Sequence, residues 1–248
     1  MRARWRYGLV LAGGYLVFLA ASVPARLALS RVPLPPTLTL TGVHGSIWSG
    51  RAVLMHTGAG PRVLSHLRFH VWPGALLHAR WGYAVRATGP VGGHFAVASG
   101  GTQMMLADVV LQAPVKVLRP LIGGLRGMGA RGTVTVHSRR VVFGAHPHGG
   151  GVVTWRHAGL ASLPVDPLGS YRIGWRVTPA GLSYSIHTLR GRLAIAGGGR
   201  WQARAGVVSF HGIMTPHGLR LQGFFSSLGT AAPGGARRIH LRLPAAAL

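Results

Sequence analysis

Residues 171–187 read YRIGWRVTPAGLSYSIH, and this stretch decides the class of the fold. Apolar residues occupy every second position on both sides of Pro179-Ala-Gly181, and arginine, serine or histidine fills most positions between them. A period of two places the apolar side chains on one face of a β-strand, and proline with glycine is typical of a turn. The stretch therefore predicts two antiparallel strands, each with one apolar and one polar face.

The same alternation recurs on both sides of this stretch. It occupies residues 65–72, 81–86, 133–137 and 238–243. Turn signals rich in glycine or proline fall at 58–61, 89–90, 149–151 and 197–199. Helical spacing is found from Pro114 to Leu125 and from Leu221 to Leu228. The predicted fold is mainly β: an antiparallel, elongated and curved sheet with one or two short helices, solvated on its arginine- and histidine-rich face. A closed sandwich is the alternative.

The charge balance is extreme. Lysine and arginine total 27 against two acids, Asp108 and Asp166, which gives +25 before 14 histidines are counted. So few carboxylates exclude enzymes that work through paired acids. The arginines are dispersed rather than clustered, which argues against nucleic-acid binding. A shortage of acids fits an acidic compartment, because carboxyl groups with an ordinary pKa of about 4 are largely protonated there.

Histidine positions agree with an acidic compartment. The histidines expected on polar strand faces are His66, His70, His137, His187 and His240. A solvated histidine becomes charged at low pH without a burial penalty. We therefore expect the β-fold to persist down to about pH 3.

The first thirty residues predict a membrane anchor. Arg2, Arg4 and Arg6 precede an uncharged stretch, and a helix over residues 7–29 would cover about 34 Å, enough for a bilayer core. The arginines favour a cytoplasmic N-terminus and an exported remainder. A cleaved signal peptide is the alternative, because small residues near position 25 suit a peptidase. The predicted segments are a cytoplasmic N-terminus (1–6), a transmembrane anchor (7–29), a proline-rich linker (30–37) and a periplasmic β-rich domain (38–248).

The sequence lacks the residue patterns of enzymes and metal sites. His146, His148 and His157 lie in a glycine-rich region without a nearby acid or cysteine, which makes a poor metal site. No serine has nucleophile-elbow spacing, and no glycine run has the pattern of a phosphate-binding loop. Asp166 is expected to shape a proline turn, and Asp108 to cap a helix or lie exposed. We predict no catalytic residue, no cofactor and no metal.

The most distinctive string is LTLTGVHGSIWSGR at residues 38–51. It predicts a strand, a glycine-rich turn and a second strand, in which Trp48 supplies a large buried surface. With the alanine that follows, it resembles the opening pattern of the type II secretion system protein N family. The matching residues are Leu40, Gly42, Val43, Gly45, Ile47, Trp48, Gly50, Arg51 and Ala52. Residues 121–136, 168–171, 188–195 and 224–243 resemble later parts of the family less closely, and Ser170 stands where the family has an acid.

The resemblance implies a single-pass inner-membrane protein without catalytic activity or a cofactor. Its periplasmic domain would contact other inner-membrane subunits of the type II secretion machinery, and its anchor would contact membrane lipid, with no nucleic-acid partner. The runner-up is a periplasmic AsmA-like lipid-binding protein whose concave apolar face holds acyl chains. A closed, filled core would favour the first function, and a continuous apolar groove open along the sheet would favour the second.

Overall fold

A computed structural model describes residues 23–26, 37–57, 62–76, 80–119, 129–202, 205–225 and 229–244. The predicted cytoplasmic segment lies outside these residues, as do the predicted anchor except for 23–26 and the linker except for residue 37. Within the described ranges, no helix is both long enough and apolar enough to span a membrane.

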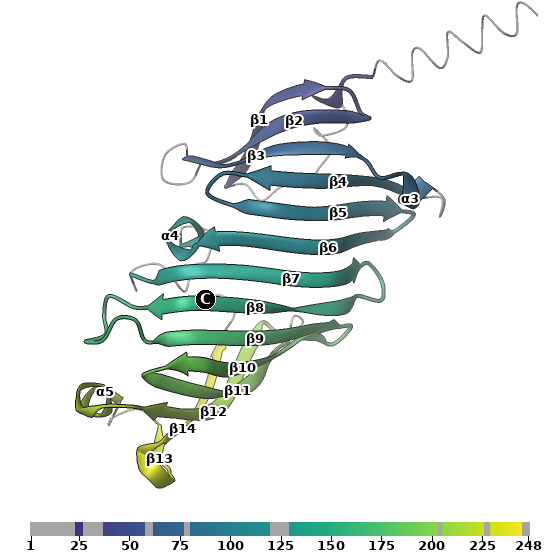
Figure 1. The fold of residues 1–248 in the computed structure, drawn as a ribbon. Coiled ribbons are helices and arrows are strands. Elements are labelled where there is room, and N and C mark those ends of the chain that lie inside the picture. The colour runs from purple at the N-terminus through teal and green to yellow at the C-terminus, as the bar shows by residue number, and fades with distance from the viewer. Residues whose placement is uncertain are drawn as a thin grey trace, which may run out of the picture.

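One 14-stranded antiparallel sheet contains all strands of the described residues. The strands are β1 (Leu38–Gly45), β2 (Ser49–His56), β3 (Arg62–Val71), β4 (Trp81–Thr88), β5 (Gly92–Gly100), β6 (Gln103–Pro114), β7 (Arg131–Phe143), β8 (His148–Gly159), β9 (Gly169–Thr178), β10 (Gly181–Gly191), β11 (Leu193–Gln202), β12 (Val207–Pro216), β13 (Thr230–Ala231) and β14 (Arg237–Pro244). Strands β1 to β12 lie side by side in sequence order, and β14 and β13 complete the far edge (Figure 1). The predicted antiparallel sheet is confirmed, and it is open rather than a closed sandwich.

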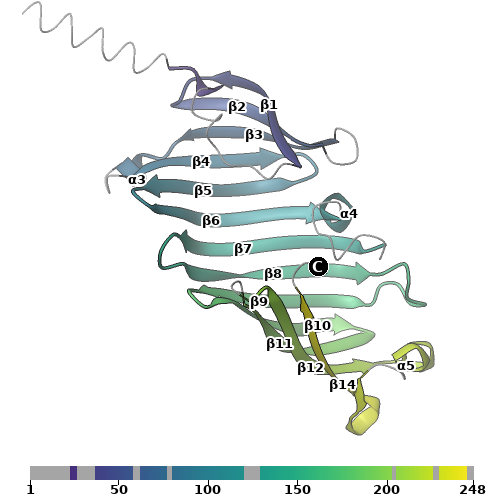
Figure 2. The same ribbon diagram turned by 180° about the vertical axis from the view of Figure 1, so that it is seen from behind.

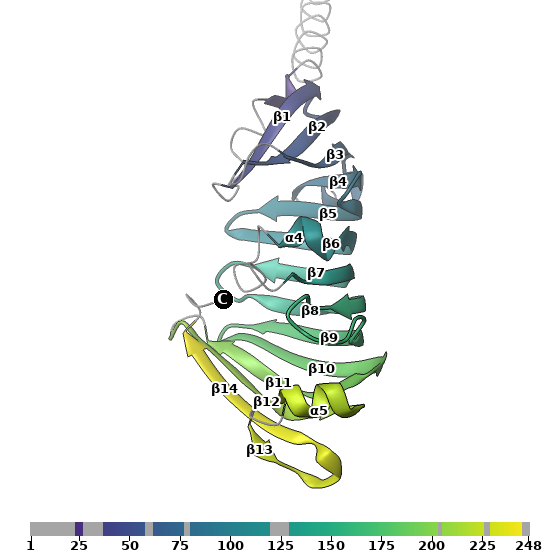
Figure 3. The same cartoon turned by 90° about the vertical axis from the view of Figure 1, so that its left-hand side faces the viewer.

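The sheet is strongly curved. Seen edge-on in Figure 3, β1 and β2 at one end and β12 and β14 at the other bend toward the same side. Figure 2 looks onto this hollow side, where β11, β12 and β14 lie in front of β9 and β10. The molecule is therefore an elongated trough with one concave and one convex face.

The helical segments named within the described residues are short. They are α3 (Pro73–Leu76), α4 (Val115–Leu118), α5 (Leu219–Phe225) and the 3-10 segment η2 (Pro233–Gly235). The helix predicted from Pro114 to Leu125 is represented by α4, and its part beyond residue 119 lies outside the described residues. The helix predicted from Leu221 begins two residues earlier, at Leu219, and is described as far as Phe225.

Cross-strand register gathers the apolar side chains on one face of the sheet. Directly paired residues of neighbouring strands point to the same side. Ile173 of β9 pairs with Val153 of β8 and with Ile186 of β10. The next position along the same strands pairs Arg172 with His187 on the opposite face. The predicted division into an apolar and a polar face is confirmed.

The apolar face is the concave one. The N–H of Val71 donates to the carbonyl oxygen of Trp48 at 2.7 Å, so the backbone groups of Val71 point toward β2. In a strand of L-residues this hydrogen-bonding direction fixes the face on which the side chain lies. In Figure 1, β3 runs left to right below β2, and the hollow side faces away from the viewer. For an L-residue whose N–H points up toward β2 in a strand of this direction, the side chain projects to the far side, so Val71 and the alternate residue Phe69 belong to the hollow side. Arginine and histidine therefore line the convex side.

Aromatic rings lie over glycines on the concave face. Trp175 is opposite Gly151, and Tyr184 is opposite Gly199. A Cβ atom on Gly151 would lie 2.8 Å from the Trp175 ring, and one on Gly199 would lie 2.6 Å from the Tyr184 hydroxyl. The prediction of turns at 149–151 and 197–199 is wrong, because these glycines lie inside β8 and β11 and make room for rings.

A closed core is present near the C-terminal end of the sheet. Leu221 and Phe225 of α5 pack with Leu168 and Leu193, and all four are buried. Leu160, Leu163, Val165, Ile195 and Met214 pack around them. In the rest of the described chain each strand contacts chiefly its two neighbours, so the concave face has no second layer there.

Candidate functional surface

The concave face carries a continuous row of apolar side chains across the described strands. Its larger side chains come from β3 to β12 and are Leu67, Phe69, Tyr83, Val97, Leu111, Val136, Val153, Ile173, Trp175, Tyr184, Ile186 and Phe210. All of them except the buried Phe69 are half-buried, because neighbouring strands cover their flanks and leave their tips open. An apolar surface this long and this accessible is typical of a surface that receives an apolar partner.

Two tyrosines turn their polar ends into the sheet. The Tyr184 hydroxyl donates to the carbonyl oxygen of Ser209 at 2.9 Å, and its ring stacks on Phe210 at 6.5 Å between centroids. The Tyr171 hydroxyl donates to the carbonyl oxygen of Leu193 at 3.0 Å. Burial raises the pKa of Tyr171 to about 12 and also raises the pKa of Tyr184. Both tyrosines are therefore neutral at physiological pH. Tyr184 is half-buried and presents part of its ring to the trough, whereas Tyr171 is 4% exposed and packs within the fold.

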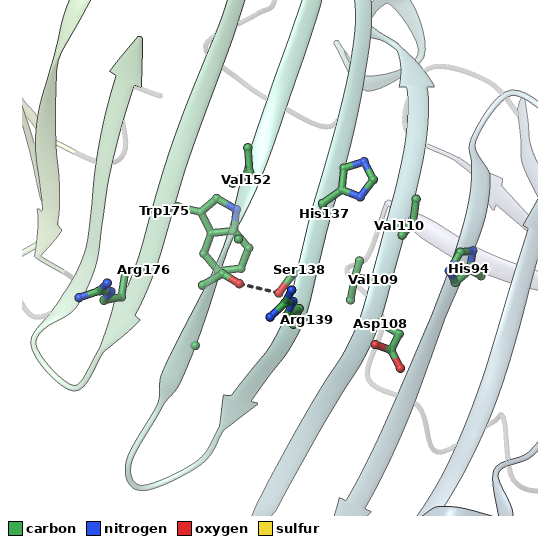
Figure 4. A pocket seen from close by; sticks show the side chains of 13 residues that line it. His94, Asp108, Val109, Val110, His137, Ser138, Arg139, Val152, Trp175 and Arg176 are labelled. Carbon is green, nitrogen blue, oxygen red and sulfur yellow. Dashed lines mark hydrogen bonds between the residues drawn. The ribbon is translucent and has the colours of Figure 1, made fainter.

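A hollow of about 820 Å³ lies where β5 to β9 are irregular (Figure 4). Register shifts occur beside Asp108 in β6, whose φ is 49°, and beside Ser138 in β7, whose Oγ donates to the carbonyl oxygen of Gly150 at 2.7 Å. Its ionisable lining residues are His94, Asp108, His137, Arg139 and Arg176.

The acidic residues and histidines considered as catalytic or metal-binding candidates lie apart from one another in the structure. Asp108 is exposed inside β6 rather than at a helix start, so the capping alternative is wrong and the exposed alternative is correct. Asp166 lies in the segment between β8 and β9 and pairs with Arg131 at 2.8 Å, with both side chains exposed. His148 contacts the carbonyl oxygen of His146 at 2.9 Å. Among the described residues no three histidine, aspartate or glutamate side chains are grouped as metal ligands.

The family-motif residues are divided between the two faces and the first turn. Leu40, Gly50 and Ala52 lie on the concave side, Arg51 is exposed on the convex side, and Val43 lies at the irregularity of β1. Two motif glycines have left-handed backbone, with φ of 57° for Gly42 and 101° for Gly45, and Gly50 leaves space for the ring of Phe69. These glycines shape the first hairpin.

Trp48 is not the buried residue that the sequence predicts. It is 38% exposed, because it lies in the turn between β1 and β2 rather than in a strand. Its ring lies 5.7 Å from that of Trp81, which is 41% exposed and donates its Nε1–H to the Tyr83 hydroxyl at 2.9 Å. We call Trp48, Trp72, Trp81 and Tyr83 the aromatic corner.

The histidines predicted to lie on polar strand faces do so, and one further histidine is buried. All five histidines expected on polar faces are exposed. His56, which the alternation did not single out, is 2% exposed, and neither ring nitrogen has a hydrogen-bond partner among the described residues.

Comparison with known proteins identifies the same family in two independent searches. A family model described as type II secretion system (T2SS), protein N matches residues 36–240, more than four fifths of the chain. A type II secretion system protein N from Vibrio cholerae serotype O1 (strain ATCC 39315 / El Tor Inaba N16961) is 41% identical over 46 residues. That alignment spans 18% of this chain and 18% of the relative, so it covers less than a fifth of the relative's length. No solved structure matches.

Proposed function

Because the chain belongs to the type II secretion system protein N family, we propose that it is a non-enzymatic, single-pass inner-membrane component of the secretion machinery. Residues 7–29 contain the anchor, and 38–248 form a periplasmic domain that contacts other inner-membrane subunits. The observation that carries the proposal is the family match, which covers nearly all of the sheet. A trough with open edges and no metal-ligand group among its described residues suits a binding part better than a catalyst.

The described end of the proposed anchor refines where the chain would leave the bilayer. The N–H of Ile47 donates to the carbonyl oxygen of Val23 at 2.9 Å, and Pro24 forms an antiparallel bridge with Ser46. An extended residue cannot continue a helix, so a membrane helix would end before Pro24. Residues 7–22 would then cover about 24 Å. That length is short for a hydrocarbon core of about 30 Å, and arginines at both ends would snorkel to the headgroups.

One preparation tests both the anchor and the partners. The tagged full chain is expressed in a host with a type II secretion system, and its membranes are washed with carbonate and dissolved in detergent. We expect the chain to stay in the washed membranes and to bring down inner-membrane secretion subunits. A variant with a cleavable signal peptide in place of residues 1–29 is the control and should wash off. Release of the unaltered chain, starting near Arg26, would establish the signal-peptide alternative, and recovery without any secretion subunit would oppose the proposed partnership.

A second candidate function follows from the concave face. Its apolar side chains form a surface that runs across the strands and is open along its length, which is the arrangement expected of a protein that holds acyl chains. The closed core occupies only the region around α5. Lipid handling could operate within the secretion machinery, so the two functions are compatible.

Two neighbouring residues provide a matched test of lipid binding. Ile173 is half-buried on the concave face, and Arg172 is exposed on the convex face of the same strand. We expect Ile173→Asp to lower retention of a fluorescent fatty acid by about tenfold or more, because a carboxylate in an apolar contact is penalised. Arg172→Asp should retain the ligand, and circular dichroism would verify that both variants fold. If the unaltered chain binds no fatty acid, the lipid-handling candidate is wrong.

A further inference from the structure

Three of the seven tryptophans meet at one corner of the sheet, although they are far apart in sequence. Trp48 lies in the turn before β2, Trp72 follows the end of β3, and Trp81 begins β4. Backbone hydrogen bonds hold the corner together: Val71 donates to Trp48 at 2.7 Å, and Trp72 donates to Gly82 at 2.8 Å. Although Trp48 and Trp72 lie just outside the strands, these hydrogen bonds tie both residues to the sheet.

The corner exposes aromatic surface that the fold does not need to expose. Trp48 and Trp81 are 38% and 41% exposed, and their rings contact each other at 5.7 Å with an interplanar angle of 55°. Trp81 also satisfies its polar group internally, through the Tyr83 hydroxyl. Exposed tryptophan, with its large apolar ring and polar N–H, is a side chain that membrane–water interfaces favour.

The corner is directly bonded to the end of the proposed anchor. Ile47, one residue before Trp48, donates to the carbonyl oxygen of Val23, and Ser46 bridges Pro24. If the chain leaves the bilayer at Val23, Trp48 lies at the depth of the lipid headgroups. Strands are spaced about 4.8 Å apart, so Trp81, two strands away, lies within about 10 Å of that level. The interfacial layer on each side of a bilayer is of comparable thickness, roughly 5–8 Å.

The charges around the corner suit an anionic membrane surface. Arg26 and Arg51 are exposed nearby, on the residues that leave the proposed anchor and on β2. The two acids of the chain lie elsewhere, in β6 and in the segment between β8 and β9. Exposed arginine next to a bilayer is attracted to anionic headgroups, and no carboxylate in this part of the sequence opposes it.

We propose that the aromatic corner rests in the headgroup layer of the membrane and seats the first strands of the sheet against the bilayer. The inference rests on the proposed anchor. The occupant of the corner is lipid rather than another protein, because the backbone of the first turn joins it directly to the segment proposed to span the bilayer. Seated in this way, the trough has a fixed membrane-proximal end at β1 to β4 and a distal end at β14.

Quenching of tryptophan fluorescence by brominated lipid tests whether the aromatic corner of the full chain lies in the headgroup layer. The chain is reconstituted into phosphatidylcholine–phosphatidylglycerol vesicles whose lipids carry bromine near the headgroup or near the chain end. We expect headgroup-near bromine to quench more strongly. The double variant Trp48→Phe/Trp81→Phe should lose about half of the quenchable signal, because Trp5 and Trp72 remain. Trp201→Phe is the matched control, because Trp201 is also 41% exposed but lies on β11, and it should leave the quenchable signal unchanged.

The outcomes separate this inference from the anchor on which it rests. Each sample is floated on a density gradient before the measurement. If the chain floats with the vesicles but the double variant keeps the full quenchable signal, the proposed headgroup contact of the aromatic corner is wrong, while the proposed membrane anchor is supported. If the unaltered chain does not float, both are overturned. The single variants Trp48→Phe and Trp81→Phe, with circular dichroism of each, show whether a loss of signal reflects unfolding; loss confined to folded variants supports the headgroup contact.

Discussion

Leu221→Ala is expected to lower the free energy of unfolding by about 2–5 kcal/mol, the usual cost of truncating a buried leucine. Leu221 is 0% exposed and lies in the closed core with Leu168, Leu193 and Phe225. The open trough offers few other fully buried large side chains, so the neighbouring residues have little other packing to compensate. Thermal unfolding followed by circular dichroism should show a midpoint about 4–20 °C lower.

Leu219 provides the control for this substitution. It lies two residues earlier in the same helix and is 86% exposed, so Leu219→Ala removes the same atoms without leaving a cavity. The expected change is within about 0.5 kcal/mol. Equal effects of the two substitutions would mean that α5 does not pack on the sheet as described.

Alkaline pH is expected to destabilise the fold through Tyr171. Burial raises the folded-state pKa of Tyr171 from 10.0 to about 12, and its hydroxyl is bonded to Leu193. Below pH 10 tyrosine is protonated in both states, and the stabilisation is fully present. Between about pH 10 and 12 the unfolded chain loses the proton and the folded chain keeps it, so the stability falls by about 2–3 kcal/mol. Denaturant titrations at several pH values would measure the loss.

Tyr171→Phe tests whether that residue causes the alkaline loss. The variant should be less stable than the unaltered chain at pH 7 by about 1 kcal/mol, because the hydrogen bond to Leu193 is gone. Its stability should then change much less between pH 10 and 12. An unchanged alkaline loss would mean that Tyr171 is not its cause.

The class of fold was predictable because the trough is built from one repeated rule. Alternation at 171–187 places Ile173 and Ile186 on one face and Arg172 and His187 on the other, as the register has them. The rule failed where glycine replaces an apolar residue within a strand. Gly151 and Gly199 continue the period of two but contribute no side chain, and only the aromatic residues opposite them explain why.

The candidate sites were less predictable, because exposure depends on neighbours that are distant in sequence. Trp48 was expected to be buried by its size, yet it lies in a turn and meets Trp81 of a non-adjacent strand. The capping alternative for Asp108 failed because β6 continues through that position with a bulge. Neither the Val23–Ile47 hydrogen bond nor the hollow between β5 and β9 has a local sequence signature.

The sequential order of β1 to β12 makes the sheet a one-dimensional stack, in which each strand depends chiefly on the two beside it. Stability in such an array approximates a sum over nearest-neighbour interfaces, and folding can propagate outward from any well-formed hairpin. Duplication or loss of a hairpin in the middle would lengthen or shorten the trough without rewiring it. Pulled from its two ends, the array should yield in hairpin-sized steps rather than in a single rupture.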